Sequence, residues 1–196
     1  MGYSRAGFEV VGVDLRNQPD YPFEFHQADA MTYPLEGFDA IHASPPCQRY
    51  SGMTVSRPGV AETYPDLIAP TRDRLRASRR PCVIENVAGA RRLLESPTML
   101  CGAMFDLDLY RHRYFEASFP LPLIMHPGHG IRGNKAGRWT PGTIISVAGH
   151  NTAIRECRRA MGIHWMTGDE LSEAIPPAYT EWIGKQLLAA LEAGDG

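Results

Sequence analysis

Short apolar runs separated by polar segments dominate the pattern along this chain. Four runs are apolar at most of their positions: residues 8–14, 38–44, 81–87 and 142–149. Strands that are covered on both faces have this pattern, whereas a strand with one solvated face alternates apolar and polar residues. The runs therefore predict strands of a buried sheet.

Two longer segments carry a helical period. The segment 59–80 places apolar and small residues near one side of a helix: Leu67, Ile68, Thr71, Leu75 and Ala77 or Ser78. Its prolines, Pro65 and Pro70, split this helix or move its start further along the chain. The segment 176–194 begins with prolines that suit a first helical turn and carries an apolar stripe: Tyr179, Trp182, Ile183, Leu187 and Leu191. Strands followed by helices predict an α/β layered fold.

Length and composition fit one globular domain. The chain has 196 residues, of which 43% are hydrophobic and 21% charged, and no apolar run approaches the roughly 18 residues of a membrane span. The first residues lack the features of a secretory signal, so we expect a cytoplasmic protein without a membrane partner. The sequence leaves the oligomeric state open. The four cysteines are far apart and form no CxxC pair, so we expect reduced thiols, with Cys82 and Cys101 inert inside apolar runs.

Charge is unevenly distributed along the chain. Residues 1–70 hold 4 Lys and Arg against 9 Asp and Glu, whereas residues 111–165 hold 8 against 2, a net charge of +6 in that segment. A basic band of this kind favours a polyanionic partner. A solvated surface of arginines explains the same count equally well.

A glycine-rich basic segment, residues 128–142, is typical of a loop. It contains GxGxxG at Gly128, Gly130 and Gly133, but neither a preceding strand nor a following helix is predicted, so we do not interpret it as a dinucleotide site. His126 and His129, with His150 downstream, have no cysteine or carboxylate at ligand spacing. We therefore interpret them as polar loop residues and expect no metal.

The stretch from Ser44 to Cys47 ends the second apolar run with two prolines and a thiol. Strand ends of open α/β sheets carry ligand sites, so Cys47 is expected to face a cleft. The prolines fix φ and remove two amide donors, which makes the loop stiff before anything binds. A nucleophile benefits from such stiffness because it must be held in near-attack geometry.

Four ordered elements give the chain a resemblance to DNA (cytosine-5) methyltransferases. Pro46, Cys47, Gln48 and Ser51 match the Pro-Cys-Gln-x-x-Ser element of that family, and "ENV" at 85–87 is similar to its second catalytic element. "RHR" at 111–113 resembles its Arg-x-Arg element, and "AIPPAYTEWIG" resembles its closing helix. The resemblance covers about residues 2–190 and is weakest over 117–150.

The resemblance implies methyl transfer from S-adenosylmethionine to carbon 5 of cytosine in DNA. Cys47 would add to carbon 6 of the base, and Glu85, protonated through burial, would donate to nitrogen 3. Arg113 and Arg111 would orient the base and a neighbouring phosphate. The partner would be double-stranded DNA with a flipped-out cytosine. Such an enzyme would belong to host modification or to a phage.

The resemblance also assigns binding residues. Those expected beside the cofactor are Asp14, Leu15, Asp29, Ala30, Pro45 and Glu173, the last standing where the family usually has Asn. Those expected beside DNA are Gln48, Ser51, Arg132, Lys135 and Arg138, with Trp139 stacking on a base. For Asp14 and Asp29 the alternative is a turn or cap role. For Arg132, Lys135, Arg138 and Trp139 the alternative is a loop without a binding role.

The expected fold is a Rossmann-like S-adenosylmethionine-dependent methyltransferase domain that lacks the family's first strand and Gly-rich loop. We expect a catalytic domain at 1–116, a short target-recognition insertion at 117–150, and C-terminal helices at 151–196 that return to the catalytic domain. Two alternatives remain open: a weak or inactive DNA-binding remnant of such an enzyme, and a relative that modifies a pyrimidine nucleotide. Methylation of an exocyclic amine is disfavoured because Cys47, not an aromatic residue, follows "SPP". A zinc deaminase is disfavoured because its Pro-Cys-x-x-Cys element is missing.

Overall fold

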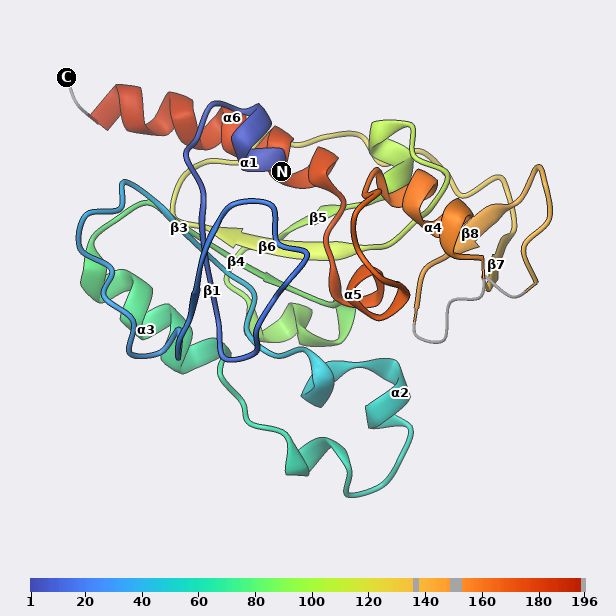
Figure 1. Ribbon diagram of the computed structural model, residues 1–196, viewed down its shortest axis with the longest axis horizontal. Coiled ribbons are helices and arrows are strands. Elements are labelled where there is room, and N and C mark those ends of the chain that lie inside the picture. The colour runs from blue at the N-terminus through green and yellow to red at the C-terminus, as the bar shows by residue number, and fades with distance from the viewer. Residues whose placement is uncertain (136–137, 149–152, 195–196) are drawn as a thin grey trace.

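A computed structural model describes residues 1–135, 138–148 and 153–194 (Figure 1). Its centre is a mixed four-stranded sheet in the order β3-β4-β6-β5. The bounds of these strands are β3 Ile41–Ala43, β4 Cys82–Asn86, β5 Thr98–Leu100 and β6 Arg113–Ala117. β3 and β4 are parallel, and β6 runs antiparallel to both β4 and β5. The strands predicted within 38–44 and 81–87 are confirmed, and the fold is mixed α/β.

Two short parallel pairs lie outside the central sheet. One joins β1 (Val11–Asp14) to β2 (Glu24–Gln27), and the other joins β7 (Gly133–Lys135) to β8 (Ile144–Ser146). The runs at 8–14 and 142–149 thus contain strands, as predicted, but the expectation that all four runs belong to one layered sheet is wrong. β8 instead buries Ile145 in a separate core, and its backbone pairs with β7, inside the segment predicted to be loop.

Helices complete the architecture. The α-helices are α1 Gly2–Arg5, α2 Gly52–Val55, α3 Ile68–Ser78, α4 Ile154–Met161, α5 Gly168–Glu173 and α6 Pro177–Gly194. The 3₁₀ helices are η1 Gln48–Tyr50, η2 Ala61–Thr63, η3 Ala88–Leu93 and η4 Gly102–Phe105. α3 starts at Ile68, which confirms the later start predicted from the prolines. α6 confirms the predicted closing helix, with Tyr179, Ile183 and Leu187 buried.

Helices cover both faces of the central sheet. Consecutive residues of β4 point to opposite faces, so each packs against a different helix. Val83 packs with Tyr179 and Ile183 of α6. Ile84 packs with Ile68 and Leu75 of α3. Figure 1 shows α6 and α3 on opposite sides of the sheet. The result is a three-layer arrangement with two hydrophobic cores.

A third core joins the remaining segments. It contains eight buried residues: Leu109, Ile145, Val147, Cys157, Ala160, Met161, Ile163 and Leu171. These residues come from all three segments expected as domains, 1–116, 117–150 and 151–196. The insertion and the C-terminal helices thus share one core with the sheet-bearing segment, and the domain boundaries stay predictions.

Two further expectations from the sequence concern membrane-spanning segments and the state of the cysteines. In the described ranges, no helix has the length and apolarity to cross a membrane. All four cysteines are free, and Cys101 and Cys157 are buried. Cys82 is only half-buried, so the expectation of a buried thiol there is wrong, because β4 begins at this residue on the rim of the sheet.

Candidate functional site

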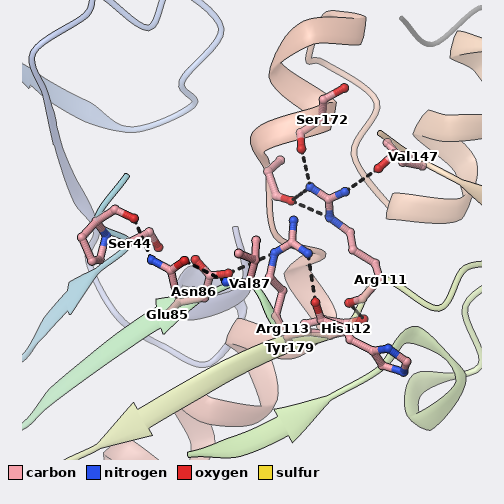
Figure 2. A network of polar contacts seen from close by, with 12 residues as sticks. Ser44, Glu85, Asn86, Val87, Arg111, His112, Arg113, Val147, Ser172 and Tyr179 are labelled. Carbon is pink, nitrogen blue, oxygen red and sulfur yellow. Dashed lines mark hydrogen bonds and ion pairs between the residues drawn. The ribbon is translucent and has the colours of Figure 1, made fainter. Parts of the chain in front are cut away.

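Cys47 sits on a short loop between β3 and η1. Its own carbonyl accepts the Tyr50 backbone N–H at 3.0 Å, which starts η1 directly behind the sulfur. The buried Asn86 side chain at the end of β4 donates to the Pro45 carbonyl at 2.9 Å. This bond ties the proline elbow to the neighbouring strand (Figure 2). Pro45 therefore has an observed structural role in positioning Cys47.

Glu85 and Arg113 form a buried ion pair across β4 and β6. Arg113 Nε lies 3.0 Å from Glu85 Oε1, with only 14% and 8% of the two side chains exposed. Burial raises the pKa of the Glu85 carboxyl, and Arg113, the Ser44 hydroxyl and Arg111 oppose that rise without cancelling it. The carboxyl is therefore easier to protonate than an exposed glutamate.

The Cys47 thiol is electrostatically coupled to that pair. Burial raises its pKa, the Arg113 guanidinium counteracts this, and the carboxylates of Glu85 and Glu173 add to it. Since the net direction is upward, the thiol is held protonated while the site contains only protein. The structure thus brings together three predicted catalytic residues, Cys47, Glu85 and Arg113, around one thiol.

Arg111 is held by backbone carbonyls. Its guanidinium donates to the carbonyls of Val147 at 2.7 Å, Ser172 at 2.7 Å and Ala174 at 2.6 and 2.9 Å (Figure 2). Burial, with Arg113 nearby, lowers its pKa to about 9. Because backbone acceptors occupy its donors, Arg111 is a positioning residue and does not contact a base or phosphate in this conformation.

The two residues expected beside DNA near Cys47 differ in their surroundings. Ser51 caps α2, its hydroxyl accepting the Thr54 backbone N–H at 3.3 Å. This is the turn role that such residues favour. Gln48 Oε1 is buried and has no hydrogen-bond partner among the described residues. An orphaned acceptor beside a nucleophile is suited to a polar ligand group.

Asp14 and Glu173, distant in sequence, are neighbours of one arginine. Arg16 Nη2 lies 2.8 Å from Glu173 Oε2, and the Arg16 backbone N–H donates to Asp14 Oδ1 at 2.8 Å. Gln18 donates to the other Asp14 oxygen at 3.2 Å. Leu15 lies beside them with 67% of its surface exposed. The residues predicted to bind the cofactor here are therefore two carboxylates, Asp14 and Glu173, and the exposed Leu15 side chain.

Asp29 and Ala30 lie in the turn after β2. Asp29 Oδ1 accepts the Met31 backbone N–H at 2.8 Å, which is an Asx turn. The Ala30 carbonyl accepts Arg74 Nε at 3.3 Å. Both residues are exposed, so the turn is accessible, but its observed bonds are those of local structure.

The candidate DNA residues of the insertion are only partly gathered. Arg132 and Arg138 are exposed, and Lys135 ends β7. Trp139 does not stand free to stack on a base: its indole donates to the Thr143 carbonyl at 2.9 Å, and the ring packs against the third core. His150 and residues 136–137 lie outside the described residues.

Some functional residues were not foreseen. The "ENV" motif gave no prediction for Asn86. The signal that could have found it is an amide side chain at the end of an apolar strand, which needs a hydrogen-bond partner when it is buried. His126 and His129 were expected to be isolated, yet Cys101 and His112 lie beside them. Sequence spacing gave no signal for that cluster, since its members come from three separate segments.

Comparison with known proteins adds no family to this picture. A scan against protein-family models finds no match for this chain, and a search of curated proteins finds none either.

Proposed function

We propose that the protein methylates carbon 5 of cytosine in double-stranded DNA through a covalent bond to Cys47. The observation that carries the proposal is the thiol on a stiff strand-end loop beside the buried Glu85–Arg113 pair. A nucleophile, a carboxyl with a raised pKa and a fixed cation suit addition to a polar aromatic ring. The four ordered sequence elements described above supply the choice of base.

The strand order supports a Rossmann-like origin for the fold. In such folds the first strand lies between the second and the fourth, giving the order 3-2-1-4. If β1, β2 and β3 correspond to the second, third and fourth strands of such a fold, β2 is expected to pair with β1. The first strand of the fold would then lie between β1 and β3, and β4 would lie on the far side of β3. The observed parallel pairs are β1 with β2 and β3 with β4. These two parallel pairs are the ones that this strand order predicts.

The protein groups divide the chemistry between them. The Cys47 thiol loses its proton to solvent as its sulfur bonds to carbon 6 of a flipped cytosine, and the proton on the Glu85 carboxyl goes to nitrogen 3, which neutralises the charge that develops on the ring. Carbon 5 is then electron-rich enough to accept a methyl group. Loss of the carbon 5 proton to solvent restores the double bond and expels the Cys47 thiolate, while nitrogen 3 returns its proton to Glu85. Arg113 holds Glu85 and stabilises the thiolate at both ends of this sequence.

S-adenosylmethionine would supply the methyl group as an electrophile on a sulfonium sulfur. The donor set at the β1 edge fits the adenosine half of this cofactor: Asp14 for ribose hydroxyls, and the exposed Leu15 side chain for an aromatic face. Glu173 approaches the same edge through Arg16.

Covalent trapping tests the proposal. A DNA duplex carrying 5-fluorocytosine cannot lose fluorine from carbon 5, so the sulfur–carbon bond persists. We expect a DNA-protein adduct on a denaturing gel that needs S-adenosylmethionine, that disappears in Cys47→Ser, and that persists in the matched control Cys82→Ser. Glu85→Gln should slow adduct formation by about 100-fold or more, since acid–base groups contribute roughly 10²–10⁴-fold.

The outcomes separate the alternatives. An adduct that survives Cys47→Ser rejects the mechanism. An adduct formed with 5-fluorodeoxycytidine monophosphate but not with DNA identifies a nucleotide-modifying enzyme. Salt-dependent DNA binding without any affinity for S-adenosylhomocysteine in calorimetry identifies a DNA-binding remnant.

A further inference from the structure

We propose that Cys101, His112, His126 and His129 bind one structural Zn²⁺ ion. One ligand atom from each residue lies within 4.8 Å of the corresponding atom of every other. The closest described contact is Cys101 Sγ to His129 Nε2, at 3.4 Å. One thiolate and three imidazoles are the soft and borderline ligands that zinc prefers.

The geometry is close to that of a tetrahedral site. Zinc–sulfur and zinc–nitrogen bonds of about 2.3 and 2.0 Å place neighbouring ligand atoms about 3.3–3.6 Å apart. The largest separation in the cluster, 4.8 Å, therefore has to shrink by about 1 Å. Rotation of exposed side chains achieves this without movement of the sheet, because His126 and His129 are exposed whereas Cys101 is buried.

An independent observation points to a ligand at this place. His112 Nε2 is buried and has no hydrogen-bond partner among the described residues. Figure 2 shows the His112 ring directed away from the guanidinium groups of Arg111 and Arg113, so it does not take part in their network. Buried imidazole nitrogens are normally paired, and a metal ion would satisfy this one.

The backbone presents the four ligands from two places. Cys101 follows β5 and His112 precedes β6, where Gly102 N–H donates to the Tyr110 carbonyl at 2.8 Å and closes the hairpin. His126 and His129 flank a Pro-Gly pair, and their ring centroids are 4.8 Å apart. Tyr110 stacks on His129 at 3.6 Å, so part of the second ligand pair is already oriented.

Fastening a loop is the structural role that this site fits. Residues 118–132, between β6 and β7, contain neither helix nor strand, and Leu123, Met125 and Ile131 are largely exposed there. A loop of this length without its own core needs an anchor to adopt one conformation. Four protein ligands leave no position for substrate, which is typical of a structural and not a catalytic zinc. The zinc would fasten this loop to the β5–β6 hairpin, next to Arg111 and Arg113.

Metal analysis of the tag-free, purified chain tests the site. We expect one zinc per chain by mass spectrometry of the metals, and after exchange into Co²⁺ a sulfur-to-cobalt charge-transfer band with the intense visible bands of tetrahedral cobalt. Cys101→Ser should abolish the charge-transfer band. His126→Gln should weaken zinc binding by more than the roughly 10- to 100-fold that loss of an outer-shell partner costs. The matched controls Cys82→Ser and His164→Gln should leave stoichiometry and spectrum unchanged.

The exposed position of His126 keeps the test informative if Cys101→Ser fails to fold. A folded wild-type chain that carries far less than one zinc, or a different metal in its place, overturns the proposal. So does a charge-transfer band that survives in Cys101→Ser, or an affinity that His126→Gln leaves unchanged. These measurements do not require methyl transfer, so their result is independent of the proposed enzymatic function.

Discussion

Two buried glutamates on neighbouring strands differ in how their charge is stabilised. Glu116 accepts Arg72 Nε and Nη2 at 2.7 Å each, and the Glu95 backbone N–H at 2.8 Å. Burial raises its pKa, but these bonds outweigh that effect and hold the pKa below the ordinary value. Glu85 has a single ion pair at 3.0 Å, so burial prevails and its pKa is raised. Hydrogen bonding thus makes one carboxylate structural and leaves the other suited to proton transfer.

Replacement of Glu116 by Gln is expected to destabilise the protein by about 1.5–3 kcal/mol at neutral pH, because Arg72 loses its two short charge-assisted hydrogen bonds and keeps only Glu95 and the Leu93 carbonyl as partners. Urea unfolding followed by circular dichroism measures this loss. The matched control Glu62→Gln, at an exposed position, should change stability by less than about 0.5 kcal/mol.

The pH dependence has a definite sign. A carboxyl whose folded pKa is depressed stabilises the fold above its unfolded pKa, and this contribution is lost as pH falls through the folded pKa. Wild type should therefore lose stability on acidification below the ordinary glutamate range, and Glu116→Gln should show a shallower loss. An unchanged acid limb in Glu116→Gln would contradict the role of this carboxylate.

At the scale of elements, the loop that carries Cys47 is held by close packing of η1 against η3. A Cβ at Gly89 would lie 2.0 Å from the Tyr50 carbonyl oxygen, which real contacts do not allow. Tyr50 is itself buried, and its hydroxyl donates to Asp66 at 2.5 Å. The backbone of the segment that carries Cys47 and Tyr50 therefore contacts the backbone of the segment after Glu85 directly at Gly89.

Gly89→Ala is expected to separate these two segments. Overpacking costs about 1–3 kcal/mol, and the displaced elbow should slow covalent trapping by Cys47 at least tenfold in protein that is still folded. Quantification of the 5-fluorocytosine adduct, normalised to folded protein, measures the effect.

Gly52→Ala is the matched control, since it lies in the same segment and a Cβ there meets nothing within 4 Å. It should trap DNA as wild type does. Equal trapping by Gly89→Ala would show that the contact with Tyr50 does not position the thiol.

At the scale of the whole molecule, the first and last helices pack against each other. Gly184 of α6 faces α1, and a Cβ there would lie 2.7 Å from the Ala6 Cβ and 3.1 Å from the Tyr3 ring. α6 also covers the central sheet through Tyr179 and Ile183. One helix therefore joins the start of the described chain to the main hydrophobic core, as Figure 1 shows.

Gly184→Ala tests this packing, because two effects have opposite signs. Helix propensity alone would stabilise the variant by about 0.5–1 kcal/mol, whereas the clash with α1 costs about 1–3 kcal/mol. We expect net destabilisation in thermal unfolding. Leu188→Ala, at a 39% exposed position of the same helix, should cost less. A stabilised Gly184→Ala would mean that α1 and α6 are not in contact in solution.

Local pattern predicted the elements that a single segment determines. β3, β4, the late start of α3 and the closing helix α6 all follow from apolar period and proline positions. The meeting of Cys47, Glu85 and Arg113 was predicted from ordered motifs. β6 was not predicted, because its polar residues Arg113 and Glu116 have partners far away in the chain, Glu85 and Arg72. Distant pairing leaves no local signature.

The same reason explains why the contacts of Arg111 were not predicted. Arg111 was expected to orient a substrate, but its acceptors are backbone carbonyls more than 30 residues further along. Its φ of +30° is rarely adopted by residues with a side chain, and the bonds to those carbonyls support it. Neither the acceptors nor the backbone angle is encoded in the motif around Arg111.

The acceptors of the Arg111 hydrogen bonds are backbone carbonyls, which every amino acid has. Substitutions at Val147, Ser172 and Ala174 leave the acceptors in place. The attachment of these two segments to the central sheet therefore depends on one arginine, whereas packing in the third core still limits which side chains fit at Val147. Substitutions at the half-buried Ser172 and Ala174 should therefore be accepted far more readily than substitutions at Arg111.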